Sequence, residues 1–200
     1  MAIAARRVIN IFLSPSFHTT TKAHSIVMPV TEFATLKLKE PYTTNNEDLR
    51  KLFQSVAKQQ ATWSGYPLTF YHNAQNPSLL HIVSGWKNAH AHQKWIASEE
   101  NQKYLSVFDP LLSVEGLAHV DVDFAQVPSN TQVLVFRKRA SDDEETKPAN
   151  GTTIGRQPAW AGEGVDVDNP KDFYYFAAYD NFDESTRAVD DGSILRRVYF

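Results

Sequence analysis

The stretch "LLHIVSGWKNAHAHQKW", residues 79–95, contains the strand–helix junction on which the fold prediction depends. Its first half is apolar and rich in β-formers, which predicts a strand over Leu79–Trp86. Asn88 has the side chain of a helix N-cap, and His92 and Ile96 then share one helical face. The stretch therefore predicts a strand that ends in a tryptophan and leads into an asparagine-capped helix.

The residues on either side complete a β-α-β-β-α-β order. We expect a strand over 30–39, a helix from Asn45 or Asn46 to about Trp63, a strand over 66–74 that forms a hairpin with the next one, a helical turn that restarts at Ser98, and a last strand over 114–124. This order is that of the split βαβ, or ferredoxin-like, arrangement.

The composition narrows the classes of function. Hydrophobic residues make up 42% of the chain and charged residues 22%, as in ordinary soluble domains. A net charge of -3 gives no basic surface for nucleic acid. The absence of cysteine excludes disulfides, thiolate nucleophiles and thiolate metal sites. No apolar run approaches the roughly 18–20 residues of a membrane span, so we expect neither nucleic acid nor a membrane as a partner.

Residues 1–28 differ in composition from the rest of the chain. They contain Arg6, Arg7 and Lys22, are rich in serine and threonine, and have no acidic residue. This is the composition of a mitochondrial transit segment, and the alternatives are a non-native extension or an over-long start. We exclude the segment from the fold prediction and expect a cytoplasmic protein, or a mitochondrial one if the segment is a targeting signal.

The residues after 125 are expected to form a degenerate second copy of the first unit. Setting Phe173 against Leu80 aligns "AAY" at 177–179 with "SGW" at 84–86, each followed by an asparagine cap. A short strand is expected over 132–137, and the acidic, Gly- and Pro-containing stretch 141–169 is expected to be a long solvated loop. We interpret 126–200 as a truncated repeat in which this loop replaces the first helix. The alternative is a coincidental strand–turn–helix.

At "LLHIVSGWKNAHAHQKWIASEENQKYLSVFDPLL" and the later "AHVDVDF", the chain resembles the antibiotic biosynthesis monooxygenase family of dimeric α+β barrels. Its fungal members look most similar. The resemblance covers about residues 29–125 and implies an α+β fold, in which ferredoxin-like units place their sheets together into a barrel. With a degenerate second repeat at 126–200, the barrel would close within one chain as an intrachain pseudo-dimer. Otherwise a homodimer would close it.

The resemblance also implies an activity. Members of the family include oxygenases that need no cofactor and act on polyketide phenols and anthrones, so we expect a cofactor-independent monooxygenase of secondary metabolism with a small aromatic substrate. Three alternatives stay open: a non-oxidative decarboxylase or cyclase on a polyketide-like acid, a non-catalytic dimeric binding module, and a haem-degrading protein. The last would need His92 as the iron ligand.

Histidines on the strands are the preferred catalytic candidates. A neutral histidine can remove the proton of a phenol at neutral pH, and the resulting carbanion can react with dioxygen directly. We expect His81 and His119 to share the strand face that lines the barrel interior. His92, at the mouth of the cavity, is the third candidate. Its neighbour His90 lies about 200° away around the helix, so the two cannot easily share a metal ion.

Four further residues are expected to contact the substrate: Phe70, Tyr71, His72 and Trp86. Each candidate has a structural alternative. His92 could hydrogen-bond a neighbouring strand, and Trp86 could fill the strand–helix junction as a core residue. The polar residues of the strands could instead meet at an interface between chains or repeats.

Overall fold

The computed structural model describes residues 29–140, 157–181 and 192–200. The expected transit-like segment, most of the acidic loop and the helix expected after Asn181 lie outside the described residues. Within the described residues, no helix has both the length and the apolar character that a membrane crossing requires.

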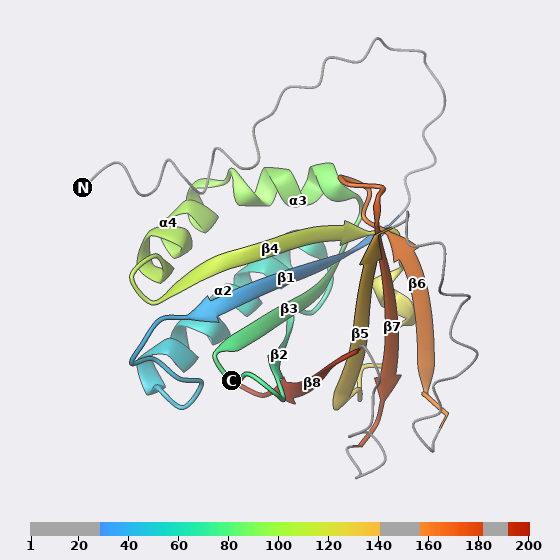
Figure 1. Ribbon diagram of the computed structural model, residues 1–200. Coiled ribbons are helices and arrows are strands. Elements are labelled where there is room, and N and C mark those ends of the chain that lie inside the picture. The colour runs from blue at the N-terminus through green and yellow to red at the C-terminus, as the bar shows by residue number, and fades with distance from the viewer. Residues whose placement is uncertain (1–28, 141–156, 182–191) are drawn as a thin grey trace, which may run out of the picture.

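The strands of the described residues form one antiparallel sheet of eight, in the order β4-β1-β3-β2-β8-β5-β7-β6. They are β1 (Val30–Leu38), β2 (Thr69–Asn73), β3 (Leu79–Trp86), β4 (Leu112–Val120), β5 (Val133–Ala140), β6 (Trp160–Val165), β7 (Asp172–Tyr179) and β8 (Ser193–Val198). The sheet is strongly curled, so that β5, β6 and β7 stand across the direction of β1, β3 and β4 (Figure 1). The fold is thus the expected α+β class, with the ferredoxin-like order β4-β1-β3-β2 in its first half.

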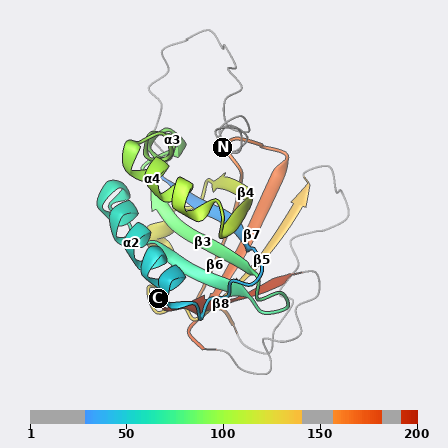
Figure 2. The same ribbon diagram turned by 90° about the vertical axis from the view of Figure 1, so that its left-hand side faces the viewer.

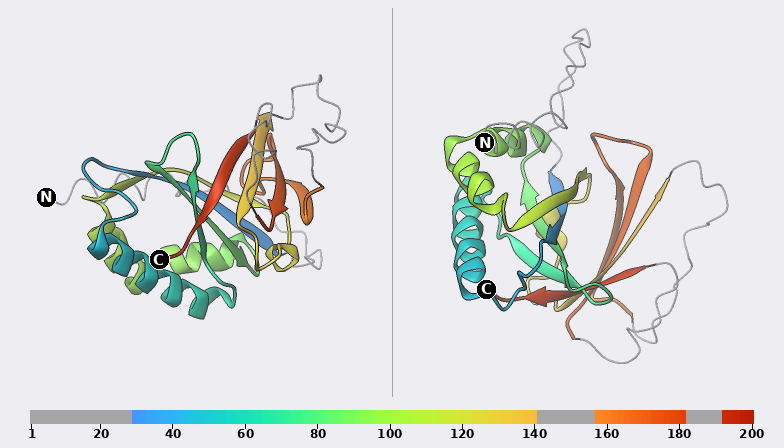
Figure 3. Two further views of the ribbon diagram at one scale, coloured as in Figure 1. Left: turned by 90° about the horizontal axis from the view of Figure 1, so that it is seen from below. Right: turned by 60° about the vertical axis from the view of Figure 1, so that its left-hand side comes forward.

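Three helices cover one face of the first four strands: α2 (Glu47–Ser64), α3 (Ala89–Ile96) and α4 (Glu99–Phe108) (Figures 2 and 3). The predicted caps are confirmed. The side chains of Asn46, Asn88 and Ser98 each accept a hydrogen bond from the backbone N–H three residues further on. Gly65 ends α2 with a φ of 80°.

The first four strands of the sheet, β4, β1, β3 and β2, separate two apolar cores. The core under the helices includes Phe53, Leu80 and Trp95, and the core inside the curled sheet includes Phe33 and Phe176. Both faces of the first-half strands are therefore buried, because the second half of the sheet covers the face that the helices leave open.

Gly85 shows why "SGW" stands at the end of β3. A Cβ atom at this position would lie 2.6 Å from Cγ of Tyr66 and 2.9 Å from Cβ of Phe124. The strand passes too close to these side chains for any residue but glycine. Trp86, the next residue, is 1% exposed and fills the core at the start of α3.

The two edge strands of the sheet meet at one end. Val120, the last residue of β4, forms an isolated antiparallel bridge with Asp166, the residue after β6. The backbone N–H of Asp121 donates to the carbonyl of Val165 at 3.0 Å, and that of Val167 donates to the carbonyl of His119 at 2.8 Å. A single chain therefore supplies all eight strands and joins both edges at this end.

Two expectations about the strands are wrong. The last strand of the first unit ends at Val120, and Asp123 caps a short 3-10 helix over Phe124–Gln126 instead of continuing it. The stretch 141–169 contains strand β6, although no apolar alternation marks it. A Cβ atom at Gly164 would lie 2.1 Å from Oδ1 of Asp121, so a larger residue there would displace this carboxylate, which accepts a hydrogen bond from the backbone of Val165.

Candidate functional site

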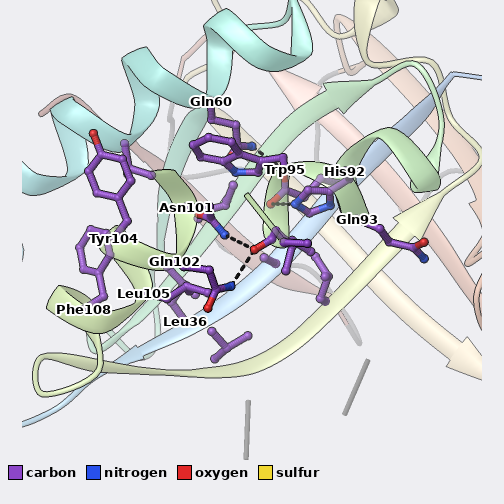
Figure 4. A pocket seen from close by; sticks show the side chains of 18 of the residues that line it. Leu36, Gln60, His92, Gln93, Trp95, Asn101, Gln102, Tyr104, Leu105 and Phe108 are labelled. Carbon is purple, nitrogen blue, oxygen red and sulfur yellow. Dashed lines mark hydrogen bonds and ion pairs between the residues drawn. The ribbon is translucent and has the colours of Figure 1, made fainter. Parts of the chain in front are cut away.

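A cavity of about 430 Å³ lies between the helices and strands β1, β3 and β4 (Figure 4). Most of its wall is apolar and includes Phe53, Leu105 and Phe108. Polar side chains gather at one end of it, where α3 approaches the ends of β1 and β4. A mostly apolar cavity of this size with a few convergent polar groups is typical of sites for small organic molecules.

The polar end holds a chain of four hydrogen-bonding groups from four different elements. Glu32 comes from β1, His92 from α3, His119 from β4 and Asp168 from the connection between β6 and β7. Nε2 of His92 lies 3.5 Å from Oε1 of Glu32, and Nδ1 of His92 lies 2.7 Å from Nε2 of His119. Nδ1 of His119 lies 2.5 Å from Oδ2 of Asp168.

Glu32 is a buried carboxyl group with two neutral donors. Nε2 of Gln60 and Nε1 of Trp86 both donate to its Oε2 atom, at 2.6 Å and 2.8 Å. Burial raises the pKa of Glu32, and the hydrogen bonds and the nearby His119 oppose this shift without cancelling it. The site therefore keeps a carboxyl group that is more easily protonated than usual.

Glu32→Gln is expected to stabilise the protein at neutral pH. Because the pKa of Glu32 is higher in the folded protein than its unfolded value of 4.5, the protein loses stability as pH rises through this range and the buried carboxyl ionises. Glutamine does not ionise, so it removes that cost. We expect a gain of about 1–2 kcal/mol, or roughly 2–8 °C in Tm, at pH 8. Thermal unfolding should show little gain at pH 4. Glu99→Gln, which removes only an exposed ion pair with Lys103, is the control and should change Tm little. A lower Tm for Glu32→Gln at pH 8 would contradict the interpretation.

His92 is held as a neutral ring. It is 3% exposed and stacks on Trp86, with ring centres 4.6 Å apart and planes 17° apart. Burial, with His119 adding to the effect, lowers the pKa of His92 well below its usual value. The unprotonated form therefore predominates at neutral pH.

The contacts of the two histidines allow one proton arrangement in which both rings are neutral. With Asp168 ionised and both rings neutral, Nδ1 of His119 donates to Asp168 and Nε2 of His119 accepts. In this arrangement Nδ1 of His92 is the donor in the contact between the rings. Nε2 of His92 is left without a proton, and its 3.5 Å distance from Glu32 is longer than a normal hydrogen bond. This nitrogen can accept a proton from a molecule in the cavity.

Asp166 fixes the connection that carries Asp168. Its Oδ1 atom accepts hydrogen bonds from the backbone N–H groups of His119 and Asp168, both at 3.1 Å. Burial raises the pKa of Asp166, and these two hydrogen bonds oppose the shift. The contact ties the loop after β6 to the end of β4 beside the site.

The structure brings together two of the three catalytic candidates and separates the third. His92 and His119 are in contact, but His81 lies on the opposite face of the sheet, stacked on Phe33 at 5.2 Å. The expectation that His81 and His119 share the interior face is wrong. It assumed that the apolar side of each strand faces the helices, whereas both sides are buried here and polarity does not distinguish them.

A β-bulge also sets the direction of His119. Thr35 pairs with Gly116 while Leu36 pairs with Val114, so Glu115 is an extra residue in β4. The bulge lets Val114 and Leu117, which have opposite parity, both line the cavity, and His119 follows Leu117 on that face.

The barrel interior is a packed core around His81. Nδ1 of His81 lies 3.2 Å from the hydroxyl of Thr35, and its Nε2 has no hydrogen-bond partner among the described residues. Burial lowers the pKa of His81 to about 4 and raises that of Tyr71, another interior residue, to about 12.

The expected substrate contacts do not gather at the cavity. Tyr71 is interior, and Phe70 packs under the helices against Phe53 and Phe200. His72 is half-buried, and burial together with the charge of Arg196 lowers its pKa. Trp86 lies behind the polar end, where it contacts Glu32 and His92.

Two members of the polar chain were missed by the sequence analysis. Glu32 had a usable signal, since it is the acidic residue on a strand face otherwise formed by Val30, Ala34, Leu36 and Leu38. Asp168 had none, because its position depends on the pairing of β6 with the end of β4.

Coordination of a metal ion or a haem iron requires particular side chains in a suitable arrangement. The described residues contain no group of three or more His, Asp or Glu side chains arranged to hold a metal ion. Nδ1 of His92 is engaged by His119, its Nε2 faces the Glu32 carboxyl, and its ring lies against Trp86. Nε2 is therefore the ring nitrogen through which His92 could bind iron, and the Glu32 carboxyl lies 3.5 Å from it.

Comparisons with known proteins identify the fold. No family model and no curated protein matches the sequence. A candidate monooxygenase from Fusobacterium nucleatum is similar in structure, with a TM-score of 0.57 and 10% identity over 87% of this chain and 94% of that one. A candidate chlorite dismutase gives 0.55 and 9%, over 87% and 96%. An anthrone oxidase-like protein gives 0.50 and 15%, over 85% and 92%. The chain therefore has the ferredoxin-like α+β barrel fold of these proteins.

Proposed function

We propose that the protein is a cofactor-independent, monooxygenase-like enzyme that removes a proton from an aromatic phenol or anthrone and lets the resulting carbanion react with dioxygen. The observation that carries the proposal is the position of His92, which is buried between His119 and Glu32 at the polar end of an apolar cavity, where burial lowers its pKa. The names of two structural neighbours, a candidate monooxygenase and an anthrone oxidase-like protein, support the same class of reaction. The finer assignment, to a fungal-type antibiotic biosynthesis monooxygenase of polyketide metabolism, rests on the sequence resemblance over 29–125.

The cavity suits a flat, mostly apolar substrate. Phe53, Leu105 and Phe108 would contact its rings, and the amide side chains of Asn101 and Gln102 lie on the wall formed by α4. Both amides donate to the carbonyl of Ile96, at 3.3 Å and 2.8 Å, so their oxygen atoms can accept from a hydroxyl group (Figure 4). A substrate bound between these amides and His92 would place its acidic hydrogen near Nε2.

The chemistry balances without a further reductant. A ring CH₂ group loses one proton to Nε2 of His92, and the carbanion gives its electrons to dioxygen to form a carbon–oxygen bond. Protonation of the outer oxygen gives a hydroperoxide. Loss of water from it leaves a carbonyl group, so one oxygen atom stays in the product and the other leaves as water. The dry aromatic wall protects the carbanion from water before oxygen capture.

The test is oxygen consumption with 1,8-dihydroxyanthrone as the substrate. We expect one dioxygen per product and, with ¹⁸O₂, one labelled oxygen atom in the new carbonyl group. Turnover in the strict absence of oxygen would overturn the oxygenase proposal and favour a decarboxylase or cyclase. Absence of both binding and turnover across a panel of phenols and anthrones would favour the non-catalytic binding module.

We propose further that residues 126–200 are a truncated second copy of the unit at 29–125. The strand order supports this. If β5 to β8 are counted as the first to fourth strands of the second half, the order β8-β5-β7-β6 is fourth, first, third, second. The first half has the same order, β4-β1-β3-β2. Pairing of β2 with β8 then joins the two units as two chains join in a dimeric barrel. On this proposal the chain is an intrachain pseudo-dimer.

A further inference from the structure

The two halves of the chain meet at the candidate site. We infer that Asp168, from the C-terminal half, receives the substrate proton at the end of a relay that begins at His92, and that it sets the tautomers of both histidines. This inference rests on the proposed function, since it names the route of the proton that the reaction removes. Asp168 acts on the reacting atoms through His119 and is therefore a positioning residue.

Exposure gives the relay a direction. The side chains of Glu32, His92 and His119 are between 2% and 5% exposed, whereas that of Asp168 is 51% exposed. Asp168 is thus the member of the chain from which a proton can pass to bulk water. The short contacts, 2.7 Å between the rings and 2.5 Å to the carboxylate, are distances at which protons transfer readily.

The arrangement removes the need for a charged ring in the cavity. As Nε2 of His92 takes the substrate proton, Nδ1 of His92 can pass its own proton to Nε2 of His119, and Nδ1 of His119 can pass one to Asp168. Both rings end neutral, the carboxylate is neutralised, and the substrate keeps the negative charge. A buried imidazolium would cost several kcal/mol of desolvation unless paired, which the low pKa of His92 also indicates.

The joining of the sheet edges positions Asp168. Its loop follows β6, whose end pairs with the end of β4, and Asp166 links the backbone of Asp168 to that of His119. The pocket built by the first half is complete only when the second half docks at this edge.

Asp168→Asn is the first test. The asparagine amide can donate to Nδ1 of His119, which would move the His119 proton to Nε2, turn Nδ1 of His92 into an acceptor and place a proton on Nε2 of His92. The base is then lost while the shape of the site is kept. We expect kcat/KM for 1,8-dihydroxyanthrone to fall about 100-fold or more, mainly in kcat, as for carboxylates that orient a catalytic histidine.

Asp121→Asn is the matched control. Its carboxylate accepts a hydrogen bond from Val165 at the same edge junction but does not contact the histidines. We expect kcat/KM within about threefold of the unchanged protein. Equal losses in the two variants would mean that Asp168 acts only by holding the edge, and would overturn the inference.

A measurement without substrate separates this inference from the proposed function. Nitrogen-15 NMR of the histidine rings should show Nδ1–H on both His92 and His119 in the unchanged protein and in Asp121→Asn, and Nε2–H on both rings in Asp168→Asn. This outcome supports the relay even if no phenol is oxidised. Unchanged tautomers in Asp168→Asn would overturn it, whatever the activity of the protein.

Discussion

His92→Phe is expected to reduce kcat/KM for a phenol or anthrone by about 10²- to 10⁴-fold, the usual contribution of a positioned general base. Phenylalanine preserves the flat ring that stacks on Trp86 and fills a similar volume. It removes both nitrogen atoms, so the cavity loses its proton acceptor and His119 loses its donor. Initial rates of oxygen consumption at several substrate concentrations would measure the loss.

His90→Phe is the control for this variant. His90 lies two residues away on the same helix, and its side chain is exposed. The same substitution there should leave kcat/KM within about twofold, because surface changes rarely perturb a site. A His92→Phe variant with a rate equal to that of His90→Phe would exclude His92 as the base.

His81→Phe is expected to make the protein less sensitive to acid. The pKa of His81 is about 4 in the folded state, and the ordinary value is 6.5. The unfolded chain therefore binds the proton first as pH falls, and stability present above pH 6.5 is lost between about pH 6.5 and 4. The difference amounts to about 3 kcal/mol, since each pKa unit corresponds to about 1.4 kcal/mol.

Urea unfolding at pH 7, 5.5 and 4 would test the His81 prediction. Between pH 7 and 4 the free energy of unfolding should fall by about 3 kcal/mol less in His81→Phe than in the unchanged protein. The phenylalanine also removes Nε2, which is buried with no hydrogen-bond partner in the part of the chain that the structure describes, and keeps the contact with Phe33. His90→Phe should follow the unchanged protein. An equal acid sensitivity in His81→Phe would show that the histidine is already solvated in the folded state.

Local chemistry made much of the first half predictable. The caps Asn46, Asn88 and Ser98 and the stop at Gly65 act within a few residues of the helix ends that they define. The hairpin of β2 and β3 follows from two β-forming runs separated by a short turn. These features do not depend on the rest of the chain, so a single sequence is sufficient to locate them.

The site was less predictable, because it depends on contacts between distant residues. Alternation along β3 shows which residues share a face with His81. It does not show whether that face lies against the helices or inside the curled sheet, since both environments are apolar. The bulge at Glu115 and the pairing of β6 with β4 have no local pattern. Glu32 is the exception, since a single carboxyl on an otherwise apolar strand face can be found from the sequence.

The joining of all eight strands in one chain also has a consequence for symmetry. Two identical subunits that built such a sheet would have to present every side chain twice, in equivalent places. A chain with two different halves is free of that constraint, so Asp168 can complete a pocket in the other half with no reciprocal contact in return. Ligand titration should accordingly give one site for each eight-stranded sheet, where a symmetric pair would give two.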